Sequence, residues 1–121
     1  MKALQEALAA FWGQFAPAYL AGHVPDGTAF PYVTFEVARP DAMGAMPLSA
    51  CVWCRGEPGF DAQAQRAGLL DRVAEAIPAR IRIGSGFALL ERGAGFQELV
   101  SDPEDREVIG GRVGYVMRYF G

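Results

Sequence analysis

The stretch PYVTFEV, residues 31–37, alternates apolar and polar side chains directly after a loop marked by proline and glycine. Successive side chains of an extended strand point to opposite sides, so the alternate positions Val33, Phe35 and Val37 share one side. Tyr32 shares the other side with two polar residues. The alternation predicts a β-strand that is buried on its apolar side only.

The predicted strand runs from Tyr32 to Ala38, and two later segments repeat its mixed polar and aromatic side. A strand over residues 48–55 places Trp53 and Arg55 on that side, and the C-terminal segment 108–120 places Arg118 and Phe120 there. The C-terminal segment is apolar on both sides, which is typical of a strand that is central in its sheet or covered twice.

Two amphipathic helices are predicted, because apolar residues recur at spacings of three and four. The first helix ends near Pro17. Asp61 is a suitable N-cap for the second helix, which Pro78 terminates. The buried stripes comprise Leu4, Leu8, Phe11 and Phe15 in the first helix and Leu69, Leu70, Val73 and Ile77 in the second.

Glycines separate three further short apolar segments, at residues 79–84, 87–93 and 96–102. We therefore expect one domain over residues 1–121, in the order helix, two strands, helix, then three or four strands. This order predicts an α+β fold, with a mainly antiparallel sheet of four to six strands and two helices packed on one face.

Composition narrows the classes of function. The chain has 121 residues, 51% of them hydrophobic, which supports a folded core, and its net charge is −3. An acidic chain is a poor candidate for binding nucleic acid through phosphate contacts. No apolar run approaches the roughly 20 residues of a membrane span, so we expect no membrane partner. Two cysteines without a secretion signal favour a reducing compartment.

Residues that could carry chemistry are few. Cys51 and Cys54 form a CxxC pair, but residues three apart on a strand face opposite sides, about 10 Å apart, too far for a disulfide. His23 is the only histidine and lies in a predicted loop without catalytic neighbours. The glycines of GSGFALL, residues 84–90, fit a turn better than a phosphate loop. We predict no catalytic, cofactor-binding or metal-binding residue, and no enzyme activity.

The acidic stretch SDPEDRE, residues 101–107, lacks the spacing of a calcium loop and is predicted to be a solvated hairpin loop. The functional alternative is an acidic rim that repels a polyanion or meets a basic partner. Its acidic residues are Asp102, Glu104, Asp105 and Glu107.

The sheet side without helices is the predicted interaction surface, since aromatic and arginine side chains are enriched at interfaces. Met43 and Met46, in the predicted connection over residues 39–47, are adaptable contact residues that could meet this side in a second copy. The predicted surface comprises Tyr32, Glu36, Trp53, Arg55, Arg118 and Phe120.

These segments resemble a family. HVPDGTAFPYVTFEV (residues 23–37) is similar to the "VP…PYvTy" opening of small tailed-phage proteins of the minor capsid or tail-terminator type. The helix at residues 61–77 and the ending at residues 91–120 resemble theirs too. Matching residues of the ending are Gly93, Gly95, Phe96 and Gln97, then Asp102 and Asp105, then Arg112 and Phe120.

The resemblance implies structural work in a virion or phage-like particle, assembled in the host cytoplasm. Such proteins form a ring, typically a hexamer, that caps the head-proximal end of the tail tube. The ring stops growth of the tube and joins it to the head connector, while DNA passes through the lumen without specific binding. The implied partners are other copies of the chain, the tail tube protein and the connector or neck protein.

Other interpretations stay open. The chain could be another neck or head-closure component, because a fold does not fix which surface is used. It could also belong to a prophage or a gene transfer particle rather than a phage. A small redox enzyme that uses CVWC (residues 51–54) is the enzymatic alternative.

Overall fold

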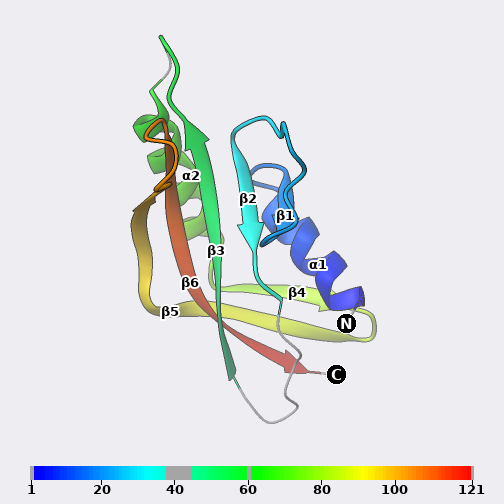
Figure 1. Cartoon of the computed structure of the whole chain (residues 1–121). Coiled ribbons are helices and arrows are strands. Elements are labelled where there is room, and N and C mark those ends of the chain that lie inside the picture. The colour runs from blue at the N-terminus through cyan, green and yellow to red at the C-terminus, as the bar shows by residue number, and fades with distance from the viewer. Residues whose placement is uncertain (1, 38–44, 60, 121) are drawn as a thin grey trace.

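A computed structural model describes residues 2–37, 45–59 and 61–120. Two helices and a six-stranded sheet make up the fold, with the strands in the order β1-β2-β3-β6-β5-β4 (Figure 1). Among the described strands, only β1 and β2 pair in parallel, and the other neighbours pair antiparallel. The elements are α1 (Lys2–Gly13), β1 (Ala18–Leu20), β2 (Tyr32–Phe35), β3 (Ala45–Arg55), α2 (Ala62–Ala76), β4 (Ala79–Ile83), β5 (Gly86–Ser101) and β6 (Val108–Phe120).

Both helices pack on the same face of the sheet, as the sequence predicts. Trp12 of α1 is fully buried, and its ring centroid lies 5.4 Å from that of Tyr115 in β6. Leu70 of α2 lies so close to Gly111 that a Cβ there would be 2.7 Å from a Leu70 methyl carbon. The core therefore lies between the helices and the centre of the sheet, where β3 and β6 pair along their length.

The second helix begins and ends where the sequence predicts. The Asp61 carboxylate accepts a hydrogen bond of 3.1 Å from the backbone N–H of Ala64, which satisfies a donor in the first turn. Ile77 has an extended backbone as the C-cap, and Pro78 follows it. The predicted stripe residues of this helix are all buried.

The strands differ from the sequence prediction in several places. The sequence did not predict β1, whose three residues are too few to show a period. The structure ends β2 at Phe35 rather than Ala38, which lies outside the described residues, and begins β3 at Ala45 rather than Leu48. As expected for a strand that is apolar on both sides, β6 is central in the sheet.

The largest correction concerns β5, which is one strand of 16 residues and not two strands separated by glycine. Its pairing with β6 shifts between Arg92 and Gln97, so the intervening residues form a bulge. Gly95 has φ +60°, and a Cβ on Gly93 would lie 3.1 Å from the backbone of Gly114. Both glycines therefore permit a bend inside the strand, visible where β5 curves in Figure 1.

Candidate functional site

The face of the sheet opposite the helices, here called the open face, is formed by alternate residues of the central strands. The pairs Tyr32–Trp53 and Cys51–Arg112 lie on it, because their neighbours Val33, Val52 and Val113 are buried in the core. No described helix covers this face. The open face comprises Tyr32, Thr34, Glu36, Ser49, Cys51, Trp53, Arg55, Glu91, Glu98, Arg112, Val116, Arg118 and Phe120.

Aromatic side chains gather at one end of the open face. The Tyr32 ring centroid lies 5.0 Å from that of Phe30 and 6.2 Å from that of Tyr19. Trp53 lies flat against the backbone of Gly110, where a Cβ would be 2.9 Å from the ring, and its Nε1–H donates a 3.1 Å hydrogen bond to the Thr34 hydroxyl. These contacts hold the rings in fixed positions at the surface.

Burial is the main cause that raises the pKa of the Tyr32 hydroxyl, and the negative charge of Asp102 adds to it. Asp102 belongs to the predicted acidic loop, so this loop and the aromatic cluster share one end of the molecule. The loop joins β5 to β6, as the sequence predicts.

The acidic loop has a defined backbone conformation. The carboxylates of Asp102 and Asp105 accept hydrogen bonds from the backbone N–H groups of Glu104 and Glu107, at 2.8 and 2.9 Å. Arg55 forms an ion pair with Asp105. The hydrogen bond from the Glu107 N–H and then the Arg55 guanidinium lower the pKa of Asp105. Arg55 is therefore engaged within its own chain rather than available to a partner.

Other predicted surface residues also have partners within the chain. The Glu36 carboxylate accepts hydrogen bonds from the backbone N–H and the hydroxyl of Ser49, at 2.9 and 3.0 Å. Arg118 forms a 3.0 Å ion pair with Glu91, and Phe120 stacks on Phe87 with ring centroids 4.9 Å apart. The open face is thus a surface already organised by contacts between neighbouring strands.

The predicted methionine contact patch needs correction. Met46 lies inside β3, paired with Met117, and packs against the core on the helix side. Met46 lies two positions before Leu48 and four before Ala50, so it shares their buried face. Met43 lies outside the described residues.

The two cysteines are free, and both are buried. Cys54 belongs to the core under the helices, whereas Cys51 lies on the open face between Thr34 and Arg112. Burial raises the pKa of Cys51 to about 12 and also raises that of Cys54. Both thiols are therefore protonated at neutral pH, which disfavours attack by a thiolate.

The remaining candidates are separated in space. His23 is exposed in the loop between β1 and β2. Gly84 has φ +59° at the first position of the turn between β4 and β5, as expected of a turn glycine. Within residues 2–37, 45–59 and 61–120, no group of three or more His, Cys, Asp or Glu residues could hold a metal ion. No described helix is long and apolar enough to cross a membrane.

The hollow beside Trp53, Cys51 and Arg112 has a volume of about 170 Å³. Pockets for small molecules are usually about 300–1,000 Å³ and well enclosed. The hollow beside Trp53 is smaller than these pockets.

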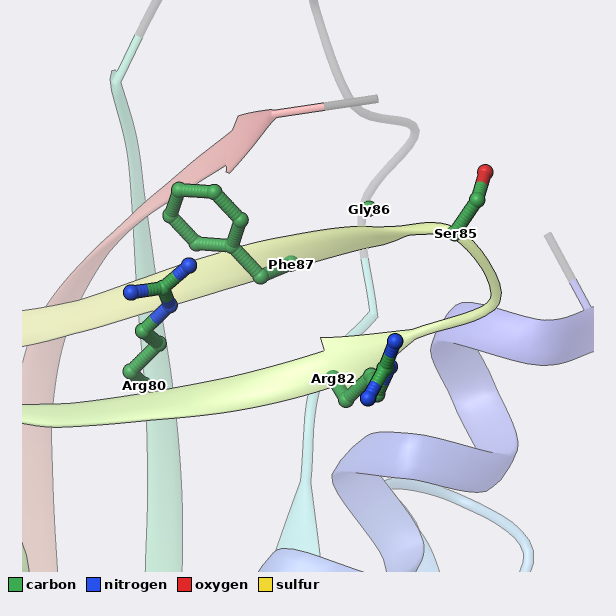
Figure 2. A pocket seen from close by; sticks show the side chains of 5 residues that line it. All are labelled: Arg80, Arg82, Ser85, Gly86 and Phe87. Atoms are coloured by element: carbon green, nitrogen blue, oxygen red, sulfur yellow. The ribbon is translucent and has the colours of Figure 1, made fainter.

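Sequence reasoning missed a second cluster at the far end of the open face. The guanidinium of Arg80 in β4 lies 3.9 Å from the ring centroid of Phe87, and Arg82 and Ser85 lie beside it (Figure 2). The alternation of arginine and isoleucine in ARIRI, residues 79–83, was the available signal. The register that brings Phe87 against Phe120 was not readable from the sequence.

Comparisons with family models, curated proteins and solved structures found no match for this chain.

Proposed function

We propose that this chain is a structural protein of a tailed phage or phage-like particle that completes the tail. Copies form a ring, of six in the simplest case, on the head-proximal end of the tail tube. The ring ends growth of the tube and provides the surface on which the head connector docks. The proposal covers the virion neck as the location and the host cytoplasm as the place of assembly.

The observation that carries the proposal is the open face of the sheet. Its ordered aromatic and arginine side chains, from Tyr32 and Trp53 at one end to Arg118 and Phe120 at the other, are of the kinds enriched at protein interfaces. Fixed side chains lose little conformational freedom on binding, which favours a stable contact. The family resemblance of residues 23–120 supplies the class of partner.

The charge of the chain supports the same proposal. The net charge of the chain is −3. A lumen through which DNA slides should avoid the counterion-releasing contacts that basic surfaces make with phosphates. An acidic ring therefore suits passage of DNA without specific binding.

Deletion of the gene from the strain that makes the particle tests this function. We expect overlong tails without heads in negative-stain images, because the tube continues to grow and lacks a docking surface. Complementation with the wild-type gene should restore normal particles. Normal virions from the deletion strain would overturn the proposal, and headless tails of normal length would point to another neck component.

A further inference from the structure

We propose that copies of this chain join head to tail, with the acidic loop of one copy covering the arginine–aromatic surface at the far end of the next. The acidic loop here means residues 102–107, and the arginine–aromatic surface means Arg80, Arg82, Phe87 and Phe120. This inference rests on the proposed ring and names the surfaces through which its copies meet.

The two surfaces lie at opposite ends of the β5–β6 hairpin. Phe87 pairs with Phe120 at one end, and Ser101 pairs with Ile109 at the other, next to the acidic loop. A strand of 13 residues such as β6 extends about 40 Å when straight. In Figure 1 the loop, drawn in orange, lies at the upper left, and the β4–β5 turn and the C-terminal end of β6 lie at the lower right.

The arginine–aromatic surface lacks balancing charge within the described chain. Among the described residues, neither Arg80 nor Arg82 takes part in an ion pair, although both are exposed. Arg80 instead lies over Phe87, whose other neighbour is Phe120, so guanidinium and rings form one layered surface. A shallow hollow of about 370 Å³ opens beside Arg80 and Arg82.

The acidic loop has the opposite charge and a fixed conformation. Glu104 and Glu107 are exposed and belong to no ion pair of the described residues, and the two aspartates hold their backbone. Guanidinium and carboxylate groups form strong charge-assisted hydrogen bonds, so each surface presents what the other requires. Because the loop is ordered beforehand, little conformational entropy is lost on docking.

Exposed apolar side chains also lie near the two ends of the β5–β6 hairpin. Among the described residues, the exposed large apolar side chains are Leu99, at 64 %, and Phe120, at 45 %. Leu99 pairs with Gly111 and therefore lies on the helix-covered side of the sheet near the acidic loop, whereas Phe120 belongs to the arginine–aromatic surface at the other end, on the open face. Two different patches that meet between copies make a heterologous contact, which closes into a ring when the rotation permits.

A second copy of the chain is a better candidate than nucleic acid for binding the arginine–aromatic surface. Phosphates would also bind Arg80 and Arg82, but the chain as a whole is acidic and repels a polyanion. The matching carboxylates, Glu104 and Glu107, are exposed on the chain itself. The middle of the open face, around Arg112 and Val116, remains for the tail tube or connector.

Charge reversal at each end tests the inference. The variant R80E/R82E and the variant E104K/E107K should each form assemblies only at concentrations raised by more than about tenfold, because like charges then face each other. Mixed in equal amounts, they should assemble again in alternation, since each reversed end meets its complement. The control variant D71K/E75K changes exposed positions on α2 and should assemble as the wild type does.

Mass photometry at low salt, with negative-stain imaging and circular dichroism to confirm folding, gives the readout. Reversal variants that assemble normally, a mixture that does not recover, or a wild-type chain that stays monomeric would each overturn the inference. So would an R80E/R82E variant that assembles normally but loses binding to duplex DNA. None of these outcomes decides the proposed function, which the deletion strain tests separately.

Discussion

At the scale of single residues, glycine decides how closely α2 approaches the sheet. A Cβ on Gly111 would lie 2.7 to 3.0 Å from three side-chain carbons of Leu70, which is itself buried. The pair therefore packs backbone against side chain at the centre of the core. The absence of a side chain at position 111 sets the separation of the two layers.

Gly111→Ala should lower the free energy of unfolding by about 1–3 kcal/mol, because the new methyl group overpacks the core against Leu70. Gly68→Ala is the matched control. A Cβ at position 68 meets nothing within 4 Å, so removal of a helical glycine should stabilise the protein by up to about 1 kcal/mol. Urea unfolding measures both changes, and equal effects of the two substitutions would contradict this packing.

Cys51 predicts a pH dependence of stability. The unfolded thiol ionises near its usual pKa of 9.0, whereas burial holds the folded pKa at about 12. The folded state therefore binds more protons between these values, and stability falls as pH rises from about 9 to 12. In urea unfolding at pH 7, 9 and 10.5, Cys51→Ala should lose less stability than the wild type. Identical curves would show that Cys51 is not buried as described.

At the scale of elements, the bulge in β5 couples the sheet to the end of α2. The guanidinium of Arg92 donates hydrogen bonds to the carbonyls of Ala74 and Ile77, at 2.7 and 3.3 Å, and lies 4.5 Å from the Phe96 ring centroid. The last carbonyls of a helix lack partners inside the helix, so Arg92 acts as its C-terminal cap.

Arg92→Ala should cost about 1 kcal/mol of stability, toward the low end for charged hydrogen bonds because the side chain is exposed. Hydrogen exchange at the last turn of α2 should also become faster. Arg106→Ala, in the exposed loop, is the control and should leave both measurements unchanged within about 0.5 kcal/mol. Equal exchange in the two variants would contradict the capping role.

The sequence predicts correctly those helices and strands that are long enough to show a periodic spacing of apolar residues. Both helices show repeated apolar spacings, and the residues of β2, β3 and β6 alternate, so their buried faces follow directly. The three residues of β1 are too few to show an alternation of apolar and polar side chains. The glycines at 93 and 95 resemble strand ends, yet they form a bulge because β6 continues opposite them.

The candidate surface was predicted only in part for a related reason. Alternation within one strand identifies Trp53 and Phe120 as members of the open face. The contacts of Arg80 with Phe87, and of Arg55 with Asp105, depend on register and on residues far apart in the chain. Met46 was misplaced because β3 begins three residues earlier than its alternation indicates.

At the scale of the whole molecule, the described residues form one helix-covered face, one open face and two ends of opposite charge. The helices bury one side of β3 and β6, and no described helix covers the other side. Separate surfaces then serve separate partners in the proposal. In that proposal, the ends join neighbouring copies, and the middle of the open face meets the tail tube or connector.

Val116→Arg should block contact with the tail tube, because it places a bulky cation in the middle of the open face. Val116 pairs with Pro47 and Glu91 at the surface, so the protein should remain folded. Ala67→Arg, exposed on α2 behind the sheet, is the matched control. Co-sedimentation with tail tubes should fall at least about tenfold for the first variant only, as expected for a charge buried in an interface.

The length of tail tubes polymerised from purified tube protein, with and without this chain, tests the central claim most directly. The account predicts that the wild-type protein and Ala67→Arg stop elongation when present at about one ring per growing end. Val116→Arg should leave the tubes long. Tubes that reach the same length with the wild-type protein as without it would contradict the account.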